Sequence, residues 1–253
     1  MNLILLSDSD FITPTHVRLT DRRFAHIQEI LKAEKDQILT VGKMNGLVGQ
    51  GKIASKTDKA VELEVKLTQN PPEALPLTLI LALPRPPMLK RILFSAAMLG
   101  VKRIIILNFN RVEKSLWNSS SLKPEAIEEQ LILGLEQAKD TVMPEVILKK
   151  GFKPFVQDEL PALIKGKTAL VAHPGASVKR PNSIDSKWVS SGVIARSEAT
   201  KQSLPILLVV GPEGGIIDYE IEALKSAGCH PIDLGPRILR TDSVLPLIVG
   251  KLF

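Results

Sequence analysis

Hydrophobic and polar positions alternate over much of the first 70 or so residues, a pattern typical of strands with one buried face. Every second residue is apolar from Val61 to Lys66. Asn45-Gly46 is a hairpin signal, because both residue types tolerate positive φ angles. Apolar residues recur instead at helical spacing over Arg23–Leu31. We therefore predict a small β-barrel with one helix over residues 1–70.

A proline-containing linker, Gln69–Glu73, precedes a region in which strands and helices alternate. Several apolar runs in this region are continuous, as strands covered on both faces of a sheet require. The predicted strands are Leu77–Leu83, Arg103–Leu107, Glu145–Leu148, Thr168–Ala172, Ile206–Val210 and Pro231–Leu234. The predicted helices are Pro87–Leu99, Pro124–Lys139, Pro154–Ile164, Asp218–Ala227 and Asp242 to the end. This alternation predicts an α/β domain with a largely parallel sheet over residues 74–253.

One segment of the α/β region, residues 175–204, is polar and has little periodicity. Structureless loops of this length are uncommon inside a compact domain. We interpret it as a long surface loop or an insertion, with a functional lid as the alternative.

Composition narrows the class of protein. Hydrophobic residues make up 44% of the chain and charged residues 24%, which is ordinary globular usage. The net charge of +6 permits an anionic partner, whereas 4% aromatic residues argue against a base-stacking platform. Asp8 and Asp10 come too early for a signal peptide, and no apolar run is long enough to span a membrane. We expect a soluble cytoplasmic protein with no metal site, since there is one cysteine and the histidines are scattered.

A glycine-rich turn, Gly211–Gly215, joins the strand Ile206–Val210 to the helix that begins near Asp218. Open α/β sheets bind ligands at the carboxyl ends of such strands. The run matches neither the dinucleotide fingerprint nor the P-loop, so a tight strand–helix turn without a ligand is an equal alternative.

Two further strand ends carry polar residues beside a turn. Arg237 and Arg240 follow a Gly-Pro turn, and His173 precedes Pro174-Gly175. Taken alone, the arginines are typical of solvated surface and the histidine of a structural role. If the three turns converge on one pocket, the arginines become candidates for holding an anionic group.

The residues at these turns resemble the 16S ribosomal RNA uridine N3-methyltransferases, a family in the SPOUT superfamily. The resemblance depends first on Gly211-Pro212-Glu213-Gly214-Gly215, followed by Leu234-Gly235-Pro236-Arg237-Ile238-Leu239-Arg240-Thr241. It extends to most of the chain outside residues 175–204, through His26–Leu31, Leu99–Val101, Glu136–Gln137, Pro144–Val146 and Leu170–Pro174.

The resemblance implies S-adenosylmethionine-dependent methylation of uridine N3 in 16S ribosomal RNA of the small subunit, by a homodimer. It implies a PUA-like RNA-binding barrel over residues 1–70 and a trefoil-knotted methyltransferase domain over residues 74–253. Arg240 and Arg237 would be catalytic, and Arg22, Arg23 and Lys139 would contact RNA. The cofactor would be held by Leu170, Ala172, His173, Pro174, Gly211, Pro212, Glu213, Gly214, Gly215, Leu234, Gly235, Pro236, Ile238, Leu239 and Thr241. N3 lies on the pairing edge, so the target uridine must be unpaired or flipped.

The chain departs from the family's pattern at several places. Ser95 and Met98 replace an expected lysine and an expected glutamate. The family has an arginine before its Val-Pro-Glu motif, and this chain has none near Asp140-Thr141. Asp242-Ser243 replaces the Glu-Thr of the family. These departures leave two alternatives open. One is an RNA-binding or ribosome-binding relative with weakened catalysis. The other is an enzyme that methylates uridine N3 or a ribose in another RNA, such as a tRNA.

Overall fold

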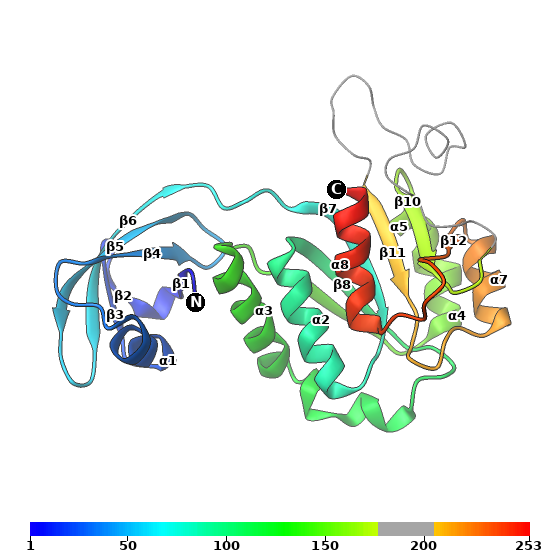
Figure 1. The fold of residues 1–253 in the computed structure, drawn as a ribbon, viewed down its shortest axis with the longest axis horizontal. Coiled ribbons are helices and arrows are strands. Elements are labelled where there is room, and N and C mark those ends of the chain that lie inside the picture. The colour runs from blue at the N-terminus through cyan, green and yellow to red at the C-terminus, as the bar shows by residue number, and fades with distance from the viewer. Residues whose placement is uncertain (177–204) are drawn as a thin grey trace, which may run out of the picture. The chain divides into compact units, whose positions relative to one another are not determined.

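The computed structural model describes residues 1–176 and 205–253 (Figure 1). The interpretation of residues 175–204 as a loop, insertion or lid falls almost entirely outside these residues. Within the described part, the chain divides into two compact units. The first unit is Met1–Glu73 with Leu131–Met143, and the second is Ala74–Gln130 with Pro144–Phe253. The sequence-based division differs at Leu131–Met143, which the sequence pattern places in the second domain.

A curled six-stranded sheet forms the first unit, in the order β1-β4-β5-β6-β3-β2. Its strands are β1 (Ile4–Leu6), β2 (Phe11–Thr13), β3 (His16–Leu19), β4 (Ile38–Lys43), β5 (Val48–Lys56) and β6 (Val61–Gln69). Only β1 and β4 pair in parallel. The alternating residues Val61, Leu63 and Val65 are buried as predicted and contribute to one apolar core.

The predicted helix and hairpin of the first unit are present with altered detail. The helix is α1 (Arg22–Ala25), begun by the side chain of Asp21, which accepts a hydrogen bond from the Arg23 amide. It continues as a π-helix, η2 (His26–Leu31). In the β4–β5 hairpin, Asn45 has a φ angle of 56°, whereas Gly46 does not adopt a positive φ.

A parallel six-stranded sheet forms the second unit, in the order β12-β10-β11-β7-β8-β9. The strands are β7 (Leu75–Ala82), β8 (Val101–Leu107), β9 (Glu145–Lys149), β10 (Thr168–Ala172), β11 (Ile206–Val210) and β12 (His230–Ile232). The α/β class with a parallel sheet is therefore confirmed. The five residues of β11 are all buried, because helices cover both faces of the sheet.

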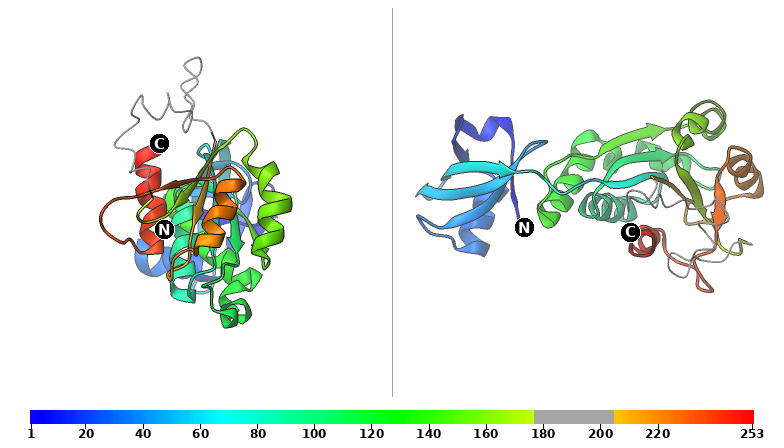
Figure 2. Two further views of the ribbon diagram at one scale, coloured as in Figure 1. Left: turned by 90° about the vertical axis from the view of Figure 1, so that its right-hand side faces the viewer. Right: turned by 90° about the horizontal axis from the view of Figure 1, so that it is seen from above.

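The helices of the second unit lie on both sides of this sheet. They are α2 (Pro86–Met98), η3 (Lys114–Asn118), η4 (Ser120–Leu122), α3 (Pro124–Ala138), α4 (Phe152–Pro154), η5 (Phe155–Glu159), α5 (Leu160–Ile164), α7 (Asp218–Ser226) and α8 (Thr241–Leu252). Figure 2 shows α2 and α8 side by side on one face and α5 on the other. The last residues of α3 belong to the first unit.

In the described part of the chain, every helix falls short of the length and apolarity needed to cross a bilayer.

Candidate functional site

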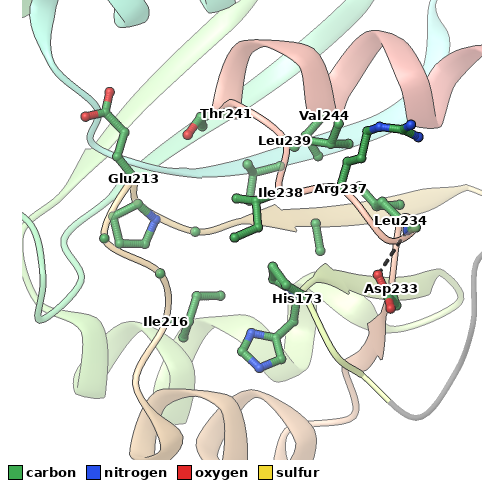
Figure 3. Close-up of a pocket in the computed structure, with 18 residues that line it drawn as sticks. His173, Glu213, Ile216, Asp233, Leu234, Arg237, Ile238, Leu239, Thr241 and Val244 are labelled. Carbon is green, nitrogen blue, oxygen red and sulfur yellow. Dashed lines mark hydrogen bonds between the residues drawn. The ribbon is translucent and has the colours of Figure 1, made fainter.

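Three neighbouring strands end at one edge of the parallel sheet, because β10 pairs with β12 on one side and β11 on the other. The turns that follow them surround a cavity of about 280 Å³ (Figure 3), which we call the strand-end pocket. It is lined by Ala172, His173, Pro174, Val210, Gly211, Pro212, Glu213, Gly214, Gly215, Ile216, Asp233, Leu234, Gly235, Arg237, Ile238, Leu239, Thr241 and Val244. The predicted convergence of the three turns is thus observed. The volume is close to the lower end of the range of about 300–1,000 Å³ for small-molecule sites.

Glycine is required at specific points of this lining. A side chain on Gly211 would overlap Ile216, so the turn closes only without one. Gly215 has a φ angle of 79°, and its amide donates to the carbonyl of Pro212 at 2.8 Å. Gly235 has a φ angle of 124°, and its amide donates to Asp233 Oδ1 at 3.0 Å (Figure 3). The backbone therefore forms much of the pocket wall.

The chemistry of the lining is mixed. Ile216, Ile238, Leu239 and Val244 provide apolar surface. Ile238 is 90% exposed and projects into the ring of lining residues (Figure 3), although an isoleucine is normally buried. The polar side chains are two carboxylates, one imidazole, one guanidinium and one hydroxyl, contributed by Glu213, Asp233, His173, Arg237 and Thr241. An exposed apolar wall with a small number of polar groups around it is typical of a site that binds an organic ligand.

The two arginines predicted to be catalytic lie in different places. Arg237 lines the strand-end pocket, whereas Arg240 does not. The Nη2 atom of Arg240 is 3.3 Å from Asp242 Oδ2, and the side chain is 62% exposed. Asp242 also pairs with Arg91 at 3.6 Å and lines a second hollow between α2 and α8, of about 540 Å³. Arg240 is therefore adjacent to the pocket residue Thr241 without contributing to the wall.

Two of the predicted cofactor residues, Leu170 and Pro236, are not among the lining residues. Leu170 is buried inside β10, where it pairs with Leu208 and His230. Sequence reasoning missed Asp233, although Asp-x-Gly is a recognisable turn in which the carboxylate accepts from a following amide.

The glycine-rich turn is fastened from the end of β8 by residues that sequence reasoning also missed. Arg111 Nη1 donates to the carbonyl of Gly214 at 2.5 Å. Glu220 is only 2% exposed and accepts two backbone hydrogen bonds, from Asn110 at 2.7 Å and from Ile217 at 3.3 Å. Glu220 lies in the first turn of α7, where the helix dipole favours a negative charge. The loop after β8 is therefore hydrogen-bonded both to the glycine-rich turn, at Gly214, and to the first turn of α7, at Glu220.

The cysteine of the chain lies outside the strand-end pocket. Cys229 is buried away from the pocket lining, and burial raises the pKa of its thiol to about 12, so a thiolate is scarce at neutral pH. Among the described residues, no three histidine, cysteine or acidic side chains cluster as metal ligands would.

The arginines predicted to contact RNA are both paired within the first unit. Arg23 is 11% exposed and all five of its N–H groups are used, by Asp10, Asp21 and the carbonyl of Leu5. Arg22 makes a bidentate pair with the buried carboxylate of Glu136, at 3.0 and 2.9 Å. Arg23 thus has no N–H group left for a phosphate. Lys139, in contrast, lines a hollow of the first unit together with Gln50 and Lys66.

A parallel α/β sheet with a ligand-sized pocket at its carboxyl edge defines a protein that binds a small organic molecule at its strand ends. The family model described as an RNA methyltransferase domain matches residues 71–252. The chain belongs to this RNA methyltransferase family, which confirms the resemblance inferred from the turns.

Relatives extend the match to nearly the whole chain. The Ribosomal RNA small subunit methyltransferase E of Treponema pallidum (strain Nichols) is 26% identical over 245 residues, covering 96% of this chain and 87% of the relative. The Ribosomal RNA small subunit methyltransferase E 1 of Borreliella burgdorferi is 25% identical over 243 residues, covering 96% and 93%. The crystal structure of a Ribosomal RNA small subunit methyltransferase E from Neisseria gonorrhoeae bound to S-adenosyl methionine has the same fold, with a TM-score of 0.72 and 19% identity. The match covers 99% of this chain and 95% of that one.

Proposed function

We propose that this protein methylates N3 of a uridine in 16S ribosomal RNA of the small subunit, with S-adenosylmethionine as the methyl donor. The observation that carries the proposal is the strand-end pocket, whose wall is the paired glycine-rich motif and lies within the segment matched by the family model. The names of the relatives from Treponema and Borreliella support the ribosomal target. Methylation of ribosomal RNA in the cytoplasm follows from this target.

The lining of the pocket fits the proposed cofactor. The apolar side chains of Ile216, Leu239 and Val244 suit the face of an adenine, and backbone groups of both glycine-rich turns are available to its edge. The carboxylate of Asp233 suits ribose hydroxyls or a cationic centre. When bound, S-adenosylmethionine supplies an electrophilic methyl group on a sulfonium.

The protein's own contribution is to orient uridine and to stabilise charge. Uridine N3 carries a proton at neutral pH, and negative charge develops on the ring as N3 loses this proton to solvent, before the methyl group on N3 neutralises it. We assign the stabilisation of this charge to the guanidinium groups of Arg240 and Arg237. Arg240 would leave its present partner Asp242, whose largely buried carboxylate, 18% exposed, keeps Arg91 as a second partner at 3.6 Å.

Three structural features complete the proposal. The first unit would be a PUA-like RNA-binding barrel, the chain near Asp233–Thr241 would take part in a trefoil knot, and two chains would pair as a homodimer. The family resemblance supports all three. Sedimentation of the purified protein gives its mass in solution and so tests the dimer. A crystal structure with a continuous backbone trace tests the knot.

The proposal is tested with labelled S-adenosylmethionine and small ribosomal subunits from a strain that lacks uridine N3 methylation. We expect one methyl group per subunit, on N3 of one uridine by mass spectrometry. Arg240→Ala should remove transfer while leaving the calorimetric affinity for S-adenosylmethionine unchanged. Failure of transfer where a relative works would overturn the proposal, and methylation of tRNA alone would replace its target.

A further inference from the structure

One carboxylate, that of Asp242, is shared by two arginines from different elements. Its Oδ2 atom is 3.3 Å from Arg240 Nη2, just before α8, and 3.6 Å from Arg91 Nη1, on α2. The side chain of Asp242 is 18% exposed, whereas each arginine side chain is 62% exposed. The carboxylate is therefore the more constrained member of this group, and the two guanidinium groups are the members that can move.

Asp242 depends on these two partners. It lies in the first turn of α8, where the helix dipole favours a negative charge. Its second oxygen, Oδ1, is buried and accepts no hydrogen bond from the residues that the structure describes. A buried charged group that loses its hydrogen bonds carries the full cost of its desolvation. Removing both arginines from Oδ2 would therefore be unfavourable, whereas removing one of them leaves the other in place.

The hollow between α2 and α8 gives the Arg91 side chain space beside Asp242. It is lined by Lys90, Arg91, Phe94, Ser95, Gln130, Asp242, Ser243 and Pro246. Asp242 is the one carboxylate among these lining residues, so it is the acidic group that Arg91 can pair with inside the hollow. Arg240 is outside this lining, in the turn that also forms the strand-end pocket. Arg91 can therefore stay on Asp242 while Arg240 moves.

We propose that Arg91 is a positioning residue for Arg240, because it keeps Asp242 paired when Arg240 turns toward the uracil. One charge-assisted hydrogen bond to the carboxylate then replaces another, and no covalent bond changes. Without Arg91, Asp242 would retain Arg240 as its one guanidinium partner, and the charge on the uracil would be stabilised less well. The proposal rests on the proposed function for the role of Arg240, and on the shared carboxylate for that of Arg91.

The test is single-turnover methyl transfer from labelled S-adenosylmethionine to small ribosomal subunits, measured over a range of protein concentrations. Arg91→Met should lower the rate constant at saturation by about ten-fold, the order expected for one lost charge-assisted hydrogen bond, or about 1.4 kcal/mol. The protein concentration that gives half of the maximal rate should stay unchanged. Arg91→Lys keeps the charge and should retain most of the rate. Lys90→Met is the matched control, since Lys90 lines the same hollow without pairing with Asp242, and it should react at the wild-type rate.

A double variant distinguishes positioning from a structural link between α2 and α8. Asp242→Asn removes the charge that retains Arg240, so Arg91→Met combined with Asp242→Asn should recover the wild-type rate constant to within about two-fold. If the ion pairs only join the two helices, the double variant stays at least as slow as Arg91→Met, and the proposal is overturned. An unchanged rate constant for Arg91→Met, with a higher half-maximal concentration, would make Arg91 an RNA contact and would also overturn it.

Labelling of Arg240 by butane-2,3-dione, followed by peptide mass spectrometry, gives a readout that needs no methyl transfer. The reagent must displace the ion pair to reach the guanidinium, so tighter pairing slows the labelling. Arg240 should react more slowly in Arg91→Met than in the wild type, and faster in Asp242→Asn. Equal labelling in the three proteins would contradict the positioning role. The expected order of labelling without methyl transfer to any RNA would retain this role and reject the proposed function.

Discussion

Glu220 provides the sharpest test of how the strand-end pocket is held. Its carboxylate is 2% exposed and accepts the amides of Asn110 and Ile217, so it links the loop after β8 to the first turn of α7. Replacement by alanine leaves two amides without their acceptor. Each buried donor left unsatisfied costs about 1–3 kcal/mol, and the Asn110 amide is close enough to solvent to recover part of that cost. We expect Glu220→Ala to lower the free energy of unfolding by about 3 kcal/mol.

The measurement is urea unfolding of the variant beside calorimetric titration with S-adenosylmethionine. For a chain of this size, a loss of about 3 kcal/mol lowers the melting temperature by about 6–12 °C. Cofactor affinity should fall in parallel, because the glycine-rich turn loses its anchor. Glu222→Ala is the matched control, since Glu222 lies on the same helix with an exposed partner, Lys225, and should change stability by less than about 0.5 kcal/mol.

Equal stability of the Glu220→Ala and Glu222→Ala variants would refute this reasoning. Loss of stability without loss of affinity would show that the β8 loop supports the fold but does not shape the pocket.

Two further substitutions and one labelling experiment also test the structure. Arg23→Met leaves the buried carboxylate of Asp10 without its guanidinium and should lower the free energy of unfolding by about 3–5 kcal/mol in urea, with a loss below about 1 kcal/mol contradicting the ion-pair account. Gly211→Ala forces a side chain against Ile216 and should weaken S-adenosylmethionine binding in calorimetry, whereas Gly250→Ala, in open space on α8, should bind normally. Cys229, whose thiol pKa is raised to about 12, should resist alkylation at pH 8 until the protein unfolds, and rapid labelling of the folded protein would contradict its burial.

The strands and helices of the second unit could be predicted because local pattern and burial agree there. Thr168–Ala172 and Ile206–Val210 are continuous apolar runs, and they form β10 and β11 at the predicted residues. The other predicted boundaries differ by at most two residues, since helix and strand ends depend on capping and on the neighbouring chain. The single helix predicted over Pro154–Ile164 is instead the succession α4, η5 and α5, and the prediction does not include η3 and η4. The pocket could be anticipated as well, because glycine-rich turns after parallel strands share one sheet edge.

Interactions between distant residues could not be predicted in this way. Arg23 has the sequence signature of a surface residue, and only folding brings Asp10 and the carbonyl of Leu5 to its guanidinium. The final part of α3 has an ordinary helical pattern, yet the carbonyl of Glu136 accepts the amide of Leu3 within the first unit. Arg23 is 13 and 18 positions from Asp10 and Leu5, and Leu3 is more than a hundred positions from Glu136, so periodicity carries no information about these contacts.

The divergence of Arg237 and Arg240 has a local cause. Both lie in the turn after β12, and Arg240 is the residue directly before α8, where its side chain makes no capping hydrogen bond. A spacing of three residues fixes a common face only within a helix, so the sequence could not tell which arginine would line the pocket. Ile238, between them, was predicted to contact the cofactor and does line the pocket.

Mapping the methylated nucleotide tests the central claim most directly. Small ribosomal subunits lacking uridine N3 methylation, incubated with the protein and labelled S-adenosylmethionine, are digested and sequenced by mass spectrometry. We predict a single labelled methyl group on N3 of one uridine in 16S ribosomal RNA. Label on a ribose hydroxyl, or absence of label from 16S ribosomal RNA while a relative modifies the same subunits, would contradict the account.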